Sequence, residues 1–464
     1  MQTDKTFRVR ILNKRGMRAQ VVSHMSSAGV LFSDIKTRHI GRKYTYRDIT
    51  VEVTNDAQGK VCLDALEAVE GIVVDEVVDE VLRLHEGGKL VHRGRYAVKS
   101  LAELREVYTP GVAKVCMAIK ENPGLANKYT NAGNTVAVVS NGSRVLGLGD
   151  LGPLPSLPVM ESKALFYGQF VGLNAVPLVL DAQTVEQFVD IVCRLEMNFA
   201  GIHLEDICTP DCIEIERQLI QRLSIPVMHD DQHGTAVVAL AAMQNMTRAV
   251  GRHLNDTVVA QVGLGAAGLA IASLSKAGGA KAVVGVDPNP AAAKYAVDYG
   301  IRLVSLSEAL QQADLICLAT GRAGLLKPEE IRPGQIILAL SNPIPEIEPD
   351  DAMAAGAAFA ADGGTVNNLL CYPGLFKGAI AAGARWITTP MKLAAARVIA
   401  ASAEKEEILP DPLDRSVHER VADSVEAAAR GEPPPDGRSS GSSPAGYVAA
   451  SLADDDERAC HEDD

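Results

Sequence analysis

The segment 256–268, DTVVAQVGLGAAG, decides the fold of the larger part of this chain. Its first residues have the apolar pattern of a buried strand, they run directly into a GxGxxG turn, and an apolar helical segment follows at 269–278. This order of strand, turn and helix is the context in which the motif binds a dinucleotide. Gly263 permits the tight turn, Gly265 lets backbone N–H groups approach a pyrophosphate, and Gly268 allows the helix to pack closely on the strand. The sequence therefore predicts an α/β, doubly wound Rossmann-type domain with a cofactor-binding turn made of Gly263, Gly265, Ala266, Ala267 and Gly268.

The nature of the dinucleotide is indicated by the next predicted strand. That strand ends at Asp287, 24 residues after Gly263, which is close to the offset of about 20 residues at which an acid holds the ribose 2′-hydroxyl. No Arg or Lys that could hold a 2′-phosphate follows before Lys294. The spacing favours NAD over NADP. The alternative is a glycine-rich packing turn with Asp287 as an ordinary loop residue.

Acidic residues occur at two further predicted strand ends. The short apolar strand 201–204 runs into Glu205 and Asp206, and Asp231 lies 25 residues after Asp206 in the segment HDDQHGTA. Carboxylate oxygens suit Mg²⁺ or Mn²⁺ far better than zinc. From spacing alone a metal site and a structural role are equally supported, because Asp230 and Asp231 could cap the following helix and the other pair could be a solvated loop.

Length and composition limit the class of protein. The 464 residues suggest about three domains, and 47% hydrophobic residues, 22% charged residues and eight cysteines are typical of a soluble protein from a reduced compartment. We expect a cytoplasmic protein without a membrane segment, since no apolar run approaches about 18 residues. The sequence shows no basic domain or stripe of the kind expected in a protein that binds nucleic acid. More than half of the formal net charge of −13 lies in 431–464, a Pro-, Ser- and Asp-rich stretch that predicts a disordered acidic tail.

The N-terminal part has a different pattern, β-α-β-β-α-β. Strands are expected at 7–12, 30–40, 45–53 and 72–82, and helices at 17–29 and 61–69. Three features of this ferredoxin-like segment are the turn that ends at Gly16, Gly29 ahead of Ser33-Asp34-Ile35, and the strand 48–53. With these features the segment resembles an ACT domain. The resemblance implies binding of a small effector such as an amino acid, with allosteric control. A dimerisation or spacer domain that binds nothing is the alternative.

Beyond about residue 90 the chain resembles malic enzymes of the small-subunit bacterial type. The ordered segments that carry the resemblance are YTPGVA at 108–113, RVLGLGDLG at 144–152, VMESKA at 159–164, Glu205-Asp206 with 229–236, and Asn367-Asn368 ahead of Pro373-Gly374. The family converts L-malate to pyruvate and CO₂ with NAD(P) and a divalent metal. One departure is Ser162, which stands where the family usually has glycine just before the lysine.

The resemblance implies a role for each matching residue. Tyr108 corresponds to the acid, Lys163 to the base with Asp230 beside it, and Glu205, Asp206 and Asp231 to the metal ligands. Arg144 corresponds to a residue that contacts a malate carboxylate, Asn368 to an amide that holds the substrate, and Asn342 to an amide at the substrate and cofactor.

The base imposes a physical requirement. To accept the C2 hydroxyl proton, Lys163 must act as a neutral amine, which needs its pKa lowered by roughly 3 units from about 10.4. Without the resemblance, Lys163 is interpreted as a lysine at a helix start, Tyr108 as a residue packed on a turn, the two amides as turn residues, and Arg144 as part of a surface ion pair.

Five segments follow from these patterns: an ACT-like domain at 1–89, a substrate and metal domain at 90–238, a Rossmann domain at 239–374, helices at 375–430 that return to the second domain, and the tail at 431–464. A homodimer or higher homo-oligomer is implied by the two resemblances. The sequence leaves two rival functions open. One is a malolactic enzyme, which would release lactate and CO₂ from the same site, and the other is an effector-binding regulatory protein with an inactive catalytic half.

Overall fold

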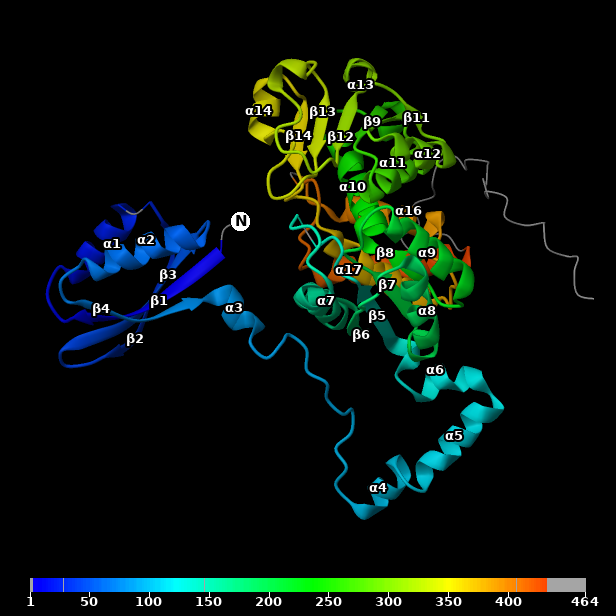
Figure 1. Ribbon diagram of the computed structural model, residues 1–464, viewed down its shortest axis with the longest axis horizontal. Coiled ribbons are helices and arrows are strands. Elements are labelled where there is room, and N and C mark those ends of the chain that lie inside the picture. Colours follow the sequence, from blue (N-terminus) through cyan, green and yellow to red (C-terminus); the bar gives the residue numbers. More distant parts are fainter. Residues whose placement is uncertain (1–2, 28, 146, 406, 432–464) are drawn as a thin grey trace, which may run out of the picture.

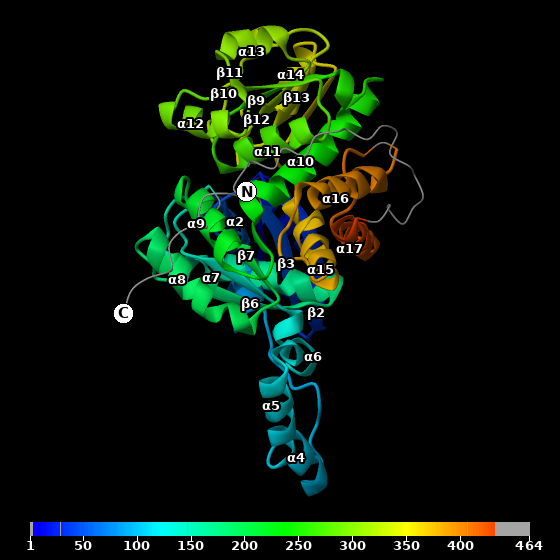
Figure 2. The ribbon, with the colours of Figure 1, turned by 90° about the vertical axis from the view of Figure 1, so that its right-hand side faces the viewer.

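The computed structural model describes residues 3–27, 29–145, 147–405 and 407–431. The predicted acidic tail lies outside these residues except for Gly431. Three sheets organise the chain (Figures 1 and 2). No helix within the described residues is long and apolar enough to cross a membrane.

The predicted Rossmann domain is present. Its six strands have the order β11-β10-β9-β12-β13-β14 and all their pairings are parallel, which is the doubly wound dinucleotide-binding order. The central strands are buried on both faces, because helices cover both sides of a parallel sheet. The strands are β9 (Val258–Val262), β10 (Ala282–Val286), β11 (Arg302–Leu303), β12 (Leu315–Leu318), β13 (Ile336–Ala339) and β14 (Phe359–Asp362). The helices are α11 (Ala266–Ala277), α12 (Pro290–Asp298), α13 (Leu306–Gln312) and α14 (Pro349–Ala354), with short turns η5 (Leu254–Asp256) and η6 (Pro328–Glu330).

A second parallel sheet, with the order β6-β5-β7-β8, precedes it in the chain. Its strands are β5 (Thr135–Ser140), β6 (Asn174–Val179), β7 (Gly201–Leu204) and β8 (Val227–His229). The connecting helices are α7 (Pro153–Phe166), α8 (Val185–Leu195), α9 (Asp211–Arg222) and α10 (Asp230–Ala249), with the π-helix η3 (Tyr167–Val171) after α7 and the 3-10 helix η4 (Glu196–Asn198) after α8. Helix α10 begins at β8 and leads into the Rossmann domain. It is buried along most of its length.

The C-terminal helices return to the second sheet. They are α15 (Tyr372–Ala381), α16 (Thr389–Ser402) and α17 (Arg415–Arg430), preceded by the turn η7 (Asn368–Leu370). Side chains from α7, α10, α11 and these three helices form one continuous hydrophobic core. Figure 2 shows α15, α16 and α17 beside α10. This core holds the two parallel sheets in a fixed relation, so residues at the carboxyl ends of both can line one site.

The N-terminal domain has the expected βαββαβ topology, with the antiparallel order β2-β3-β1-β4. Its elements are β1 (Thr3–Leu12), α1 (Met17–Ser27), β2 (Leu31–Ile40), β3 (Tyr44–Val53), α2 (Asp56–Glu67), β4 (Ile72–Asp79) and α3 (Glu80–His85). The expected strand 72–82 is too long. Asp79 ends it, because its carboxylate accepts the N–H groups of Val81 and Leu82 at 3.1 Å and so caps α3.

An arm joins the N-terminal domain to the second sheet. It consists of α4 (Leu101–Val107), α5 (Gly111–Glu121), η1 (Pro123–Leu125), α6 (Ala126–Tyr129) and η2 (Ala132–Asn134). Figures 1 and 2 show α4 and α5 extending away from both sheets. Neither helix has a buried residue, although both contain large apolar side chains.

Candidate active site

The site is assembled around Lys163, which lies near the end of α7. Its Nζ donates to Asp230 Oδ2 at 2.6 Å and to Asn368 Oδ1 at 3.3 Å, and it lies 2.9 Å from Glu205 Oε1. These partners come from the start of α10, from η7 and from the end of β7. The structure therefore brings together four of the residues that the sequence singled out.

The charge state of Lys163 differs from the expected one. Burial alone would lower the pKa of Lys163, but the carboxylates of Asp230 and Glu205 outweigh it and raise the pKa well above its usual range. Lys163 is an ammonium group in this state, with the Tyr372 ring centroid 4.7 Å from its Nζ. The lowered pKa that a neutral base requires is therefore absent from this state, because the two carboxylates outweigh burial.

The three predicted metal ligands also converge. One oxygen each from Glu205, Asp206 and Asp231 lies within 4.8 Å of the others. Asp206 has a left-handed backbone (φ 54°), and its N–H donates to Asp231 Oδ2 at 2.9 Å. Burial, and after it the charge of Asp231, raise the pKa of Glu205 to about 8. A bound cation would offset both effects, because it favours the ionised carboxylate. This all-oxygen set fits Mg²⁺ or Mn²⁺, and the Asp231 side chain is 39% exposed, which leaves a path for the ion.

The alternative role of the two acids as helix caps receives little support. Helix α10 begins at Asp230 without a side-chain cap. The carboxylate of Asp230 instead accepts from Lys163, and that of Asp231 accepts from the Asp206 N–H. Gly234, which sequence reasoning missed, packs against the Asp230 carboxylate so closely that any larger side chain would collide with it.

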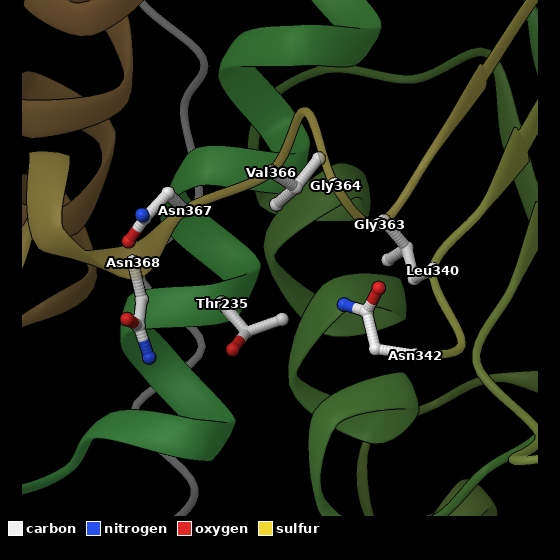
Figure 3. A pocket seen from close by; sticks show the side chains of 8 residues that line it. All are labelled: Thr235, Leu340, Asn342, Gly363, Gly364, Val366, Asn367 and Asn368. Atoms are coloured by element: carbon white, nitrogen blue, oxygen red, sulfur yellow. The ribbon is translucent and has the colours of Figure 1, made fainter. Parts of the chain in front are cut away.

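A cavity of about 350 Å³ is lined by Asn368, which contacts Lys163, and by loop residues of the Rossmann domain. Figure 3 shows Asn368 on one side, Thr235 between, and Asn342 on the other side. Both predicted amides thus face one cavity, one from η7 and one from the loop after β13. Sequence reasoning missed Thr235, Gly363 and Gly364, which also line it.

The glycine turn has the expected geometry. Gly263 has φ 86°, and a Cβ there would lie 2.5 Å from the Ala319 carbonyl oxygen. A Cβ at Gly268 would collide with the Gly263 carbonyl, whereas Gly265 faces open space at the start of α11, where Ala266 and Ala267 form the first turn. A helix start beside open space is suited to a pyrophosphate.

Asp287 lies at the end of β10, beside this turn. Its Oδ2 accepts the Leu264 N–H at 2.7 Å and its Oδ1 accepts the Asn289 N–H at 2.8 Å. The carboxylate therefore contacts the cofactor turn directly, which an ordinary loop residue would not do.

Tyr108 is not brought to Lys163, and the Arg144 side chain makes no contact with it in the described structure. Tyr108 caps the end of α4 on the arm and is 66% exposed, and Figure 1 shows α4 remote from α7. The Arg144 side chain is exposed, while its backbone N–H donates to the Asp206 carbonyl oxygen at 3.1 Å. Within one chain, the described residues place the predicted base Lys163 in this cluster but not the predicted acid Tyr108.

A buried pair behind the site was not predicted. His203 Nε2 lies 2.8 Å from Glu205 Oε2, and its Nδ1 lies 2.9 Å from the Tyr167 hydroxyl. Burial lowers the pKa of His203 to about 4, so the ring is neutral. The spacing of both residues in the sequence could have indicated that they lie beside the site. His203 precedes Glu205 by two residues on a strand, and Tyr167 follows Lys163 by four residues on a helix, so each lies on the same side as its predicted partner.

A Rossmann domain beside a half-buried lysine and three convergent carboxylates is typical of nicotinamide-dependent oxidoreductases that have a divalent-metal site. Comparisons with known proteins narrow the class. Residues 95–220 match the malic enzyme N-terminal domain, and residues 226–323 match the NAD-binding domain of D-isomer specific 2-hydroxyacid dehydrogenases. The chain belongs to the malic enzyme family.

Relatives that align over most of the chain support this assignment. NAD-dependent malic enzyme 1 of Bacillus subtilis is 45% identical over 416 residues, 89% of this chain and 95% of that protein. NAD-dependent malic enzyme of Geobacillus stearothermophilus is 39% identical over 89% of this chain and 91% of its own. The crystal structure of malic enzyme from Pyrococcus horikoshii aligns with a TM-score of 0.71 at 37% identity, covering 76% of this chain and 90% of that one.

Proposed function

We propose that this chain is an NAD-dependent malic enzyme, which converts L-malate and NAD to pyruvate, CO₂ and NADH. The observation that carries the proposal is the contact of Lys163 with Glu205, Asp230 and Asn368 beside a cavity bounded by the Rossmann domain. Membership of the malic enzyme family supports it. The intact lysine and carboxylates disfavour the alternative of an inactive regulatory protein.

Lys163 serves as the base that takes the C2 hydroxyl proton while hydride leaves C2 for the nicotinamide. It must first release its own proton, and Asp230 is in position to take it, with Oδ2 at 2.6 Å. Burial raises the pKa of Asp230 to about 6, which brings this carboxyl group closer to neutral pH than an ordinary aspartate. Asp230 and Lys163 then act as one proton-sharing pair.

Glu205, Asp206 and Asp231 would hold Mg²⁺ or Mn²⁺. The ion they hold would supply Lewis-acid stabilisation of the negative charge that develops on the C2 oxygen. Asn342 and Asn368 orient the substrate by hydrogen bonds, Asn342 also borders the nicotinamide, and Arg144 pairs with a malate carboxylate. Asp287 holds the NAD ribose, which favours NAD over NADP.

Tyr108 supplies the proton to C3 of the enol, and we propose that it does so in a second copy of the chain. Five large apolar side chains of the arm are between 37% and 73% exposed: Leu101, Leu104, Val107, Val112 and Met117. A row of exposed apolar side chains indicates a protein partner. A homodimer in which each arm covers the partner's site would bury this surface and complete both sites.

The activity itself is tested with the full chain, L-malate, NAD and Mn²⁺. We expect NADH formation that EDTA abolishes and Mn²⁺ restores. Without the ion the three ligand carboxylates repel one another, and the negative charge of the enolate is not stabilised. NADP should support a lower kcat/KM. The carbon products are identified by NMR. Pyruvate supports the proposal, lactate without net NADH indicates malolactic chemistry, and no turnover refutes both.

We also propose that the N-terminal domain is an ACT-like module that binds a small amino or organic acid. A cavity of about 370 Å³ on its sheet is lined by charges of both signs, including Arg8, Arg38, Asp48 and Glu76. Such a lining suits a small carboxylate or zwitterion. At a hundredfold excess over Kd, an effector would stabilise its domain by about 2.7 kcal/mol.

A thermal-shift screen of amino and organic acids against the full chain is therefore expected to give at least one ligand that raises the unfolding midpoint. Arg38→Ala should remove that rise and leave the unliganded midpoint close to that of wild type, because Arg38 is more than half exposed. A flat screen contradicts effector binding.

A further inference from the structure

The segment just after α3 contacts the helix that carries Lys163. The backbone N–H of Lys89 donates to Glu161 Oε2 at 3.1 Å. Gly88 has φ 77°, and a Cβ there would lie 3.1 Å from Glu161 Oε1. Leu90 packs against the main hydrophobic core. The chain is thus attached to α7 before it continues into the arm.

The Lys89 ammonium has three partners at hydrogen-bond distance. Its Nζ lies 2.6 Å from His85 Nε2, 2.7 Å from Ser162 Oγ and 2.8 Å from the Pro158 carbonyl oxygen. His85 Nδ1 lies 2.7 Å from the Val81 carbonyl oxygen, which assigns the ring proton to Nδ1 and leaves Nε2 as an acceptor. All three ammonium donors are used.

These acceptors belong to two different parts of the molecule. His85 ends α3, which Asp79 caps and which packs on β1 and β4 of the N-terminal domain. Pro158 and Ser162 lie on α7, and Ser162 directly precedes Lys163. Lys89 is also half-buried, so water competes weakly for its bonds. The path from the N-terminal sheet to Lys163 therefore runs through α3, Lys89 and α7.

We propose that Lys89 is a positioning residue that couples the N-terminal domain to the active-site base by holding α3 against α7 at Ser162. A shift of the N-terminal domain moves α7 through this contact and changes how Lys163 meets Asp230 and Glu205. The proposal rests on the role of Lys163 in the proposed function. It also explains Ser162, whose hydroxyl accepts a hydrogen bond from Lys89 that a glycine could not accept.

The coupling is tested in the full chain with Lys89→Met, Ser162→Ala and the double variant. We expect each single change to lower kcat about tenfold, since a misplacement of about 1 Å near a reacting group can cost up to 10²-fold. The double variant should lose no more than about the larger single loss, because both changes break one contact. Lys89→Arg should recover part of the rate. Lys60→Met, on an exposed site of the same domain, is the matched control.

Hydrogen exchange separates positioning from simple anchoring. In Lys89→Met, amides of α7 around Ser162 and of α3 should exchange faster together, while those of the Rossmann sheet stay at the wild-type rate. Unchanged kcat with a lower unfolding midpoint would mean a purely structural contact and would overturn the inference. Additive losses in the double variant would also overturn it. Absence of malate turnover in wild type would refute the proposed function instead, and the exchange data would still report on the coupling.

Discussion

Lys163→Ala is expected to lower kcat for malate oxidation by about 10³-fold or more, because it removes the group that accepts the C2 hydroxyl proton. The truncation leaves space beside Asp230 and Glu205. A small primary amine added to the solution should therefore restore part of the rate, and the restored rate should follow the concentration of the free amine. Steady-state kinetics with and without methylamine measure both effects.

The pH dependence offers a second check on the same pair. Burial raises the pKa of Asp230 to about 6, and the protonated form cannot take a proton from Lys163. We therefore expect kcat/KM of wild type to fall as the pH drops through about 6, and Asp230→Asn to remove activity across the range. Lys281→Met, on an exposed position, should behave as wild type. An active Lys163→Ala variant that does not respond to amine would exclude Lys163 as the base.

Mixing inactive Tyr108→Phe and Lys163→Ala chains is expected to restore activity. If Tyr108 acts in the partner's site, a mixed dimer has one site with both groups intact and one site with neither. Random exchange of subunits makes half of the dimers mixed, so about one quarter of wild-type activity should return. Activity is followed while the two variants exchange subunits, and light scattering reports the assembly.

The matched control is a chain that has both substitutions, mixed with wild type. Each mixed dimer then lacks a complete site, because the site with an intact Lys163 receives the arm with Tyr108→Phe, and the other site has lost its lysine. Activity should therefore fall to about half of its value before exchange. If Tyr108 instead acts within its own chain, the first mixture stays inactive and the second keeps its starting activity. A chain that remains monomeric during turnover would contradict the shared site altogether.

Some of the site was predictable because it depends on local backbone geometry. The GxGxxG turn is such a case: a strand, a tight turn and a helix start are adjacent in sequence, and Gly263 and Gly268 have the close backbone approaches that exclude a side chain. The acids Glu205, Asp206 and Asp231 follow parallel strands, whose carboxyl ends share one edge of the sheet. Their convergence is therefore a consequence of the order of strands and helices along the chain.

Other features depended on contacts between distant residues. The raised pKa of Lys163 comes from Asp230, 67 residues away, and no local pattern shows that burial would be outweighed by paired carboxylates. The solvent-exposed place of Tyr108 follows from an arm whose helices α4 and α5 bury no residue against the rest of the described chain. The role proposed for Ser162 depends on Lys89, 73 residues earlier.

The sequence by itself determined the malic enzyme family, the dinucleotide turn and the acids at the strand ends, because each is encoded by neighbouring residues and by the alternation of strands and helices. Only the tertiary structure decided the protonation state of the base, the separation of Tyr108 from Lys163 within one chain, and the attachment of the N-terminal domain to α7. These properties arise from long-range packing, in which the electrostatic and steric surroundings of a side chain are set by elements far from it in the sequence.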